Sequence, residues 1–164
     1  MKACAFTGYR PEKLPFGSDE TDPRCEQLKQ RLFCEILKMT REGVHVFLCG
    51  MARGVDMWAA ETVLQIQAAA PLRRIQLWAI VPYDRQALAW SAQEQARYQR
   101  ILKRASRIEY VSHEYYEGCL QKRNRYMVDH ASCLLAVYDG KPGGTASTIR
   151  YAQQKGLDIT IIEP

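Results

Sequence analysis

A continuous apolar stretch, Val44–Cys49, interrupted only by His45, lies between Gly43 and Gly50. A strand with apolar residues on both faces must be covered on both faces, which is typical of a parallel sheet with helices on either side. Similar short runs recur along the chain, and segments with apolar residues at helical spacing lie between them. Strands that alternate with helices and are joined by short loops predict an α/β fold with right-handed crossovers.

The expected elements form one doubly wound, mostly parallel sheet flanked by helices. The expected strands are residues 2–6, 44–49, 75–81, 108–111, 133–138 and 159–162. The expected helices are residues 23–42, 55–69, 92–105, 117–131 and 145–155. Asp22 followed by Pro23 is a typical helix start, and Ser91 with Glu94 resembles a capping box.

The composition fits one domain with a single core. The chain has 164 residues, of which 47% are hydrophobic and 25% charged, which is ordinary for a globular protein. No apolar run approaches the roughly 20 residues of a membrane-spanning helix, and the N-terminus lacks the apolar region of a signal peptide. The six cysteines form no C-x-x-C pair, so we expect buried, reduced thiols and a cytoplasmic location. The three histidines are scattered too, and the sequence predicts neither a metal site nor a cofactor.

The formal net charge of +5 favours anionic partners in general. Much of the positive charge lies in residues 97–107 and 122–125. We interpret the first group mainly as a solvated helix face, because no basic stripe is interleaved with exposed aromatic side chains. Binding of a nucleic acid is a possibility that the sequence neither requires nor excludes. A homo-oligomer is also possible, because the hydrophobic pattern does not distinguish a helix face at a subunit interface from one in the core.

A glycine turn follows the apolar stretch, at the edge where α/β proteins bind ligands. Gly50 and Gly54 frame this turn between a strand and a helix. Such a junction aims backbone N–H groups and the positive end of a helix dipole at one spot. Arg53 adds a cation that suits a phosphate, and Asp56 adds a hydroxyl acceptor. The alternatives are a surface ion pair for Arg53 and a dipole contact for Asp56.

A second junction of the same kind lies near the C-terminal end. Gly143, Gly144 and Thr145 follow an expected strand and open the last helix. We expect this loop to face the first junction across the sheet edge. No Gly-Lys-Ser/Thr follows, so the loop is not a Walker A motif and does not imply hydrolysis of Mg-ATP. A plain turn is the alternative.

The remaining candidates lie after the first strand, after the third strand, and on one face of the fourth helix. They are Thr7, Gly8, Tyr9, Arg10, Pro82, Tyr83, Arg123 and Asn124. The loop 7–10 could close over a ligand, with Arg10 clamping an anion. Tyr9 and Tyr83 suit base stacking, with ordinary packing as the alternative. No catalytic triad or carboxylate pair is evident, so these residues predict binding of an anionic, nucleotide-like molecule without specifying a reaction.

Three segments together resemble the SLOG superfamily, which includes the DNA-processing protein DprA, the Lonely Guy phosphoribohydrolases and molybdenum-cofactor carrier proteins. The segments are Phe6–Pro11, Gly50–Glu61, and Lys122–Asp129 with its continuation Tyr138–Thr145. The chain is most similar to the YpsA-like branch of small bacterial proteins, over nearly its whole length. The resemblance implies one SLOG-type Rossmann-like domain over residues 1–164, with a site for nucleotides or nucleotide-derived ligands.

The resemblance also bears on catalysis. In the Lonely Guy enzymes an arginine before the Pro-Gly-Gly loop and a glutamate just after it carry N-glycosidic cleavage. Arg123 matches that arginine by its spacing to Met127, whereas Ile149 or Arg150 stands where the glutamate would be. DprA-like proteins share the Gly-x-Ala-Arg-Gly-x-Asp pattern and bind single-stranded DNA.

Three functional hypotheses follow. The first is a binding protein or sensor for a nucleotide or NAD-derived ligand, with Arg53 and the amides of residues 143–145 holding a phosphate. The second is an N-glycosidic hydrolase of nucleoside monophosphates or NAD, in which Arg123 assists and Asp56 or Asp129 replaces the absent glutamate. The third is a single-stranded DNA-binding protein of the DprA type. The absent glutamate favours binding over catalysis.

Overall fold

Six strands form one parallel sheet in the computed structural model, which describes residues 1–164. The strands are β1 (Lys2–Thr7), β2 (Val44–Cys49), β3 (Gln76–Val81), β4 (Arg107–Tyr110), β5 (Cys133–Val137) and β6 (Asp158–Ile162). Their spatial order is β4-β3-β2-β1-β5-β6, and every neighbouring pair is parallel. The doubly wound α/β fold is confirmed.

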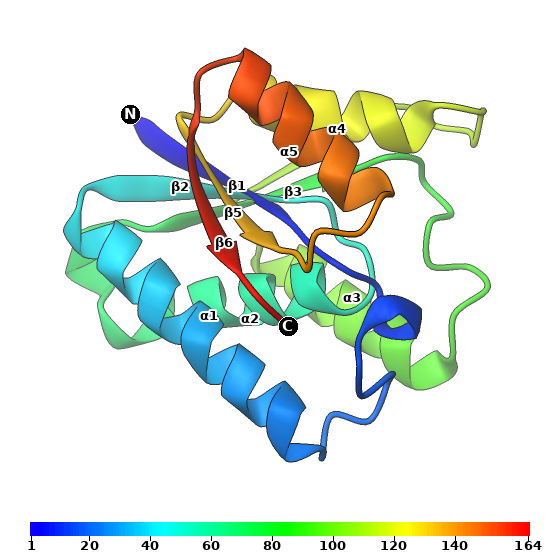
Figure 1. The fold of residues 1–164 in the computed structure, drawn as a ribbon, viewed down its shortest axis with the longest axis horizontal. Helices are drawn as coiled ribbons and strands as arrows, with labels where there is room; N and C mark the ends of the chain where they lie inside the picture. The colour runs from blue at the N-terminus through cyan, green and yellow to red at the C-terminus, as the bar shows by residue number, and fades with distance from the viewer.

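Five helices cover the two faces of the sheet. They are α1 (Pro23–Arg41), α2 (Val55–Ala69), α3 (Ala92–Arg104), α4 (Cys119–Asp129) and α5 (Gly144–Gln154). Figure 1 shows α1, α2 and α3 on one side of the sheet and α4 and α5 on the other. Two short 3₁₀ helices, η1 (Pro11–Lys13) and η2 (Pro71–Arg73), lie in connecting segments.

The helix ends follow from local chemistry. The Asp22 side chain accepts a hydrogen bond from the Arg24 N–H, and Ser91 and Glu94 form both halves of a capping box, as predicted. Helix α4 begins at Cys119, two residues later than expected. The reason is Gly118, whose φ of +95° lies in the left-handed region and cannot continue a helix.

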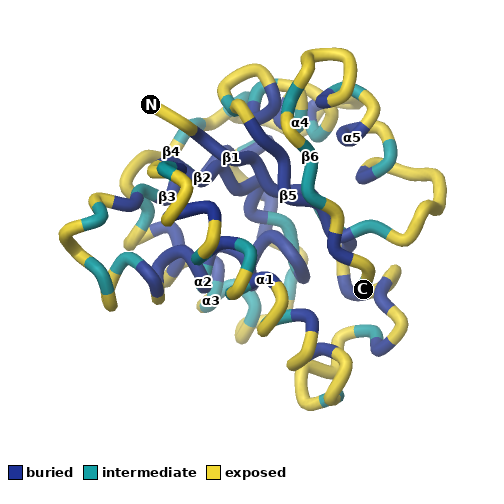
Figure 2. Tube along the Cα trace, turned by 60° about the vertical axis from the view of Figure 1, so that its left-hand side comes forward, coloured by how far each residue is buried: buried dark blue, intermediate teal, exposed yellow.

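The core lies on both sides of the central strands. Figure 2 shows β1, β2 and β5 coloured mostly as buried, in agreement with their burial patterns. The larger apolar cluster lies between the sheet and α1–α3, and it includes Leu28 and Leu32 of α1 and the stacked rings of Phe6 and Phe47. Each fully buried leucine contributes about 1.5–3 kcal/mol to folding. A smaller cluster, which includes Met127 of α4, packs α4 and α5 on the opposite face.

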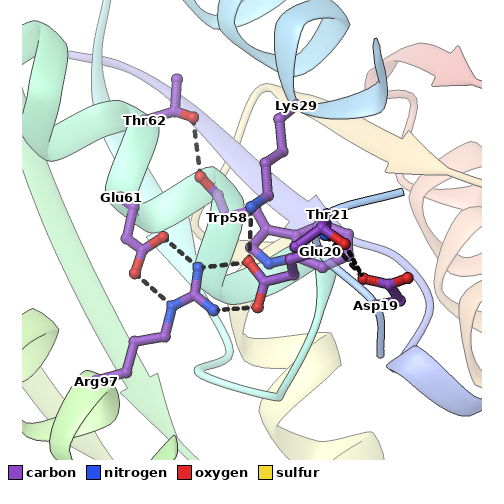
Figure 3. A network of polar contacts seen from close by, with 8 residues as sticks. All are labelled: Asp19, Glu20, Thr21, Lys29, Trp58, Glu61, Thr62 and Arg97. Atoms are coloured by element: carbon purple, nitrogen blue, oxygen red, sulfur yellow. Dashed lines mark hydrogen bonds and ion pairs between the residues drawn. The ribbon is translucent and has the colours of Figure 1, made fainter. Parts of the chain in front are cut away.

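An ion-pair network fastens the segment before α1 to α2 and α3. The Arg97 guanidinium donates to Glu61 at 2.5 Å and to Glu20 at 2.6 Å, and Glu20 also accepts from Lys29 (Figure 3). Arg97 is therefore not part of a purely solvated helix face, because two carboxylates from distant segments reach it.

The structure shows no disulfide, no cluster of potential metal ligands and no helix suited to a membrane. All six cysteines are free thiols, and only Cys34 is exposed. No group of three or more histidine, cysteine, aspartate or glutamate side chains is arranged to hold a metal ion. None of the helices is both long enough and apolar enough to cross a membrane.

Candidate functional site

The candidate site lies where the order of the strands reverses. The neighbours β1 and β5 lead into loops that diverge toward opposite faces of the sheet, and ligands of such folds bind in the crevice between these loops. Thr7 near the end of β1 is paired with Ala136 near the end of β5, so the two loops begin next to each other. The Tyr9 hydroxyl donates to the Asp139 carboxylate and so joins the two loops. A cleft of about 450 Å³ opens there, within the usual size range of small-molecule sites.

The cleft brings together nine of the residues singled out from sequence. They are Thr7, Gly8, Tyr9, Arg10, Asp56, Arg123, Asn124, Gly144 and Thr145. Both glycine junctions contribute, through Asp56 at the start of α2 and through Gly144 and Thr145 at the start of α5.

Six other candidates lie outside the lining of this cleft: Gly50, Arg53, Gly54, Pro82, Tyr83 and Gly143. Arg53 forms an ion pair with Glu12 at 2.5 Å and approaches Glu94 at 3.7 Å. Its guanidinium is engaged by carboxylates that lie far away in the sequence. The Tyr83 ring packs edge-on against Tyr115, with 5.3 Å between ring centroids.

Arg123 is a buried arginine in the lining of the cleft. Its side chain, on α4, donates to the Gly50 carbonyl oxygen and, at 2.8 Å, to the Asn124 side-chain oxygen. A Cβ on Gly50 would lie 2.7 Å from Arg123 Cζ, so glycine at position 50 makes room for the guanidinium. Burial lowers the pKa of Arg123, and the negative charge of Asp56 opposes that shift.

Asp56 is the second buried charge in the cleft. Its Oδ2 accepts a hydrogen bond from the Ala52 N–H at 3.1 Å. Burial raises the pKa of Asp56, although Arg123 and the Ala52 N–H oppose the shift. Asp56 and Arg123 both line the cleft but form no ion pair with each other. A buried carboxyl with a raised pKa in a cleft is typical of a functional site.

The loop that carries Ala52 is strained. Met51 is fully buried and has a φ of +60°, which lies in the left-handed region that residues other than glycine rarely adopt. Strain of this kind is often found at binding and catalytic sites. Here it belongs to the turn that directs the Ala52 N–H toward Asp56.

The rim of the cleft carries more positive than negative charge, because its acid Glu12 is paired with Arg53. Helix α5 has no side-chain cap and no acidic residue in its first turn, so its first N–H groups carry the positive end of the dipole without compensation. Lys13 lies close to this end, because a Cβ on Gly143 would be 2.8 Å from Lys13 Nζ. Arg10 and Lys13 line the cleft, and neither forms an ion pair.

Lys13 and Gln121 line the cleft but were not among the sequence candidates. Lys13 lies three residues after Arg10 in the 3₁₀ turn η1, a spacing at which side chains eclipse. Gln121 precedes Asn124 by three residues on α4, so the two share a helix face. These spacings are the signals that could have identified both residues.

Two solved structures of DNA processing protein A share this fold. The protein from Helicobacter pylori, described for its single-stranded DNA binding mode, superposes with a TM-score of 0.68 at 16% identity. The protein from Streptococcus pneumoniae superposes with a TM-score of 0.63 at 14% identity. The matches cover 99% and 100% of this chain, which spans only 66% and 51% of those two chains.

Two proteins found by sequence similarity have a higher sequence identity to this chain than these two structures do. A UPF0398 protein from Halalkalibacterium halodurans is 32% identical over 100% of this chain and 89% of its own length. A UPF0398 protein from Bacillus cereus strain B4264 is 30% identical over 95% of this chain and 85% of its own. Residues 4–164 match the family described as the YspA SLOG family. The resemblance seen in the glycine junctions thus extends over residues 4–164, and the chain belongs to the YspA SLOG family.

Proposed function

We propose that this protein binds a nucleotide or a nucleotide-derived ligand, with NAD-type molecules included, in the cleft at the strand-order reversal. The observation that carries the proposal is the positive rim, formed by Arg10, Lys13 and the uncapped start of α5. Arg10, Lys13 and the start of α5 all line this cleft, and its acid Glu12 is already paired with Arg53, so a bound anion would meet an excess of positive charge. A phosphate is such an anion and also accepts hydrogen bonds from the helix N–H groups.

Each part of the cleft has a role in this proposal. The phosphate lies against Gly144 and Thr145, and Lys13 and Arg10 close over it. Asp56 is deeper in the cleft and, as a buried acceptor, suits a ribose hydroxyl. Arg53 holds Glu12 at the edge of the cleft and so acts as a positioning residue instead of a phosphate ligand.

Calorimetric titration with AMP tests the proposal. We expect measurable binding to the wild type and a loss of about tenfold or more in affinity for Lys13→Gln, because a hydrogen bond to a charged group contributes about 1.5–3 kcal/mol. Lys103→Gln is the matched control, since Lys103 is exposed on α3, away from the cleft. Absence of AMP binding, or equal affinities for wild type and Lys13→Gln, would overturn the proposal.

N-glycosidic hydrolysis is a second candidate, favoured by the raised pKa of Asp56 beside Arg123 in the cleft. Of the two carboxylates suggested to replace the absent glutamate, Asp129 does not line the cleft and is engaged by Lys155 at 3.1 Å and the Tyr151 hydroxyl at 2.9 Å. Asp56 is therefore the candidate acid. Incubation with nucleoside monophosphates or NAD should then release free base, and Asp56→Asn should abolish the release. No free base from the wild type would exclude this activity.

Binding of single-stranded DNA is a third candidate, favoured by the fold shared with the H. pylori protein and by the net charge of +5. This activity predicts retardation of a labelled oligonucleotide at low salt, with an affinity that falls steeply as salt rises. An oligonucleotide that migrates unchanged at low salt would exclude it.

A further inference from the structure

A second cleft, of about 390 Å³, lies between α4 and α5 and adjoins the candidate site. The two clefts share Gln121, Asn124 and Gly144 in their linings, so they meet at the start of α5. The second cleft is lined by ten residues, of which none is acidic. This lining is mostly polar and contains no carboxylate that would repel an anion.

Two arginines from different helices face this second cleft. Arg125 belongs to α4 and Arg150 to α5, and both are exposed. Neither forms an ion pair. Arg125 lies over the Tyr151 ring, with its Cζ 5.4 Å from the ring centroid. The nearby acid Asp129 does not line the cleft and is already paired with Lys155.

We propose that the cleft between α4 and α5 is a second phosphate-binding subsite, so that the ligand is a nucleotide with an additional phosphoryl group. The proposal rests on the proposed nucleotide-binding function, because the first phosphate lies at the positive rim. Arg125 and Arg150 both line the cleft without acidic partners, and the planar guanidinium of each arginine offers paired N–H donors that match phosphate oxygens. The shared lining at Gly144 lets one ligand reach both clefts.

The test compares AMP with ADP and with adenosine 3′,5′-bisphosphate by calorimetric titration. We expect at least one of the two larger ligands to bind about tenfold tighter than AMP. The double variant Arg125→Gln/Arg150→Gln should remove this gain while leaving AMP binding unchanged. Lys13→Gln should weaken all the ligands. Arg100→Gln is the matched control, because Arg100 is an exposed arginine on α3.

The outcomes separate the two proposals. If AMP binds through Lys13 but the double variant binds ADP and the bisphosphate as tightly as the wild type, the second subsite is wrong and the first proposal stands. If the double variant weakens AMP as strongly as the larger ligands, its arginines serve the first phosphate and the second subsite is again wrong. If no adenine nucleotide binds the wild type, both proposals fail.

Discussion

Arg123 donates a hydrogen bond to the carbonyl oxygen of Gly50, and its guanidinium occupies the space that a side chain at position 50 would need. This contact joins α4 to the end of β2, across 73 positions in the sequence. It gives Gly50 a role apart from ligand contact, because the residue makes room for a buried charge in the wall of the cleft.

Gly50→Ala should therefore displace Arg123. The new Cβ would lie 2.7 Å from Arg123 Cζ, and the flexible arginine, not the backbone, would move. We expect a loss of about 1 kcal/mol in the free energy of unfolding, the usual value of one hydrogen bond. Urea denaturation measures this loss. Gly144→Ala is the control, because a Cβ there meets nothing within 4 Å. Equal stability of the two variants would contradict the assigned role of Gly50.

Gly8→Ala should destabilise the fold more severely. A Cβ on Gly8 would lie 2.5 Å from a methyl group of Val55, which is buried at the start of α2 and cannot move away easily. Overpacking of this kind costs about 1–3 kcal/mol. In a double-mutant cycle, Val55→Ala should restore part of the stability lost in Gly8→Ala. Additive losses in the double variant would mean that this contact is not the cause.

Asp56→Asn should stabilise the protein at pH 7 and impair its function. Because burial raises the pKa of Asp56, the folded state binds this proton more tightly than the unfolded chain does. Stability therefore falls as pH rises through the interval between the unfolded and folded pKa values. In the Asp56→Asn variant the free energy of unfolding should not decrease with pH in this interval, because asparagine does not ionise. The variant should therefore be more stable than the wild type at pH 7, and its side-chain oxygen can still accept the hydrogen bond from the Ala52 N–H.

The pKa of Asp139 is shifted in the opposite direction to that of Asp56, so its substitution should change stability with the opposite sign. The hydrogen bond from Tyr9 lowers the pKa of Asp139, so this carboxylate stabilises the fold above the unfolded pKa and loses that effect as pH falls through the folded one. Asp139→Asn should thus lower stability at pH 7. Denaturation curves for both variants from pH 3 to pH 8 check the signs, and a shift in the same direction at pH 7 would contradict the assignment.

The network around Arg97 should make the segment before α1 sensitive to acid. Burial opposes ionisation of Glu20, yet the hydrogen bonds from Arg97 and Lys29 outweigh it and lower the pKa of Glu20 to about 2. The stabilisation is present above the unfolded pKa and disappears as pH falls toward 2. Glu20→Gln should therefore reduce stability at pH 7 and have little effect near pH 2. With the Glu20 side chain 36% exposed, we expect about 1 kcal/mol or less.

Urea denaturation at several pH values measures this effect. Glu117→Gln is the matched control, because Glu117 is exposed and forms no ion pair. A stability loss in Glu20→Gln that stays constant from pH 7 to pH 2 would show that the contribution of Glu20 is not ionic.

The order and type of the elements could be predicted because their signals are local. Apolar periodicity, the capping box at Ser91 and the glycine turn at Gly50 each act over a few residues. Parallel strands bring all their following loops to one edge, so the approximate position of the cleft followed from the same pattern. The start of α4 differs from the expected one because a single backbone angle at Gly118 sets it, and the hydrophobic pattern does not report that angle.

The chain by itself determined the sheet, its helices and the edge at which a ligand can bind, because these depend on short-range hydrophobic pattern and backbone geometry. Only the tertiary structure decided which charges face the cleft. Arg53 is paired with Glu12, 41 positions away, whereas Lys13 lies against the start of α5. Ion pairs and hydrogen bonds act over a few ångströms of space, and a sequence does not record which distant residues the fold brings that close.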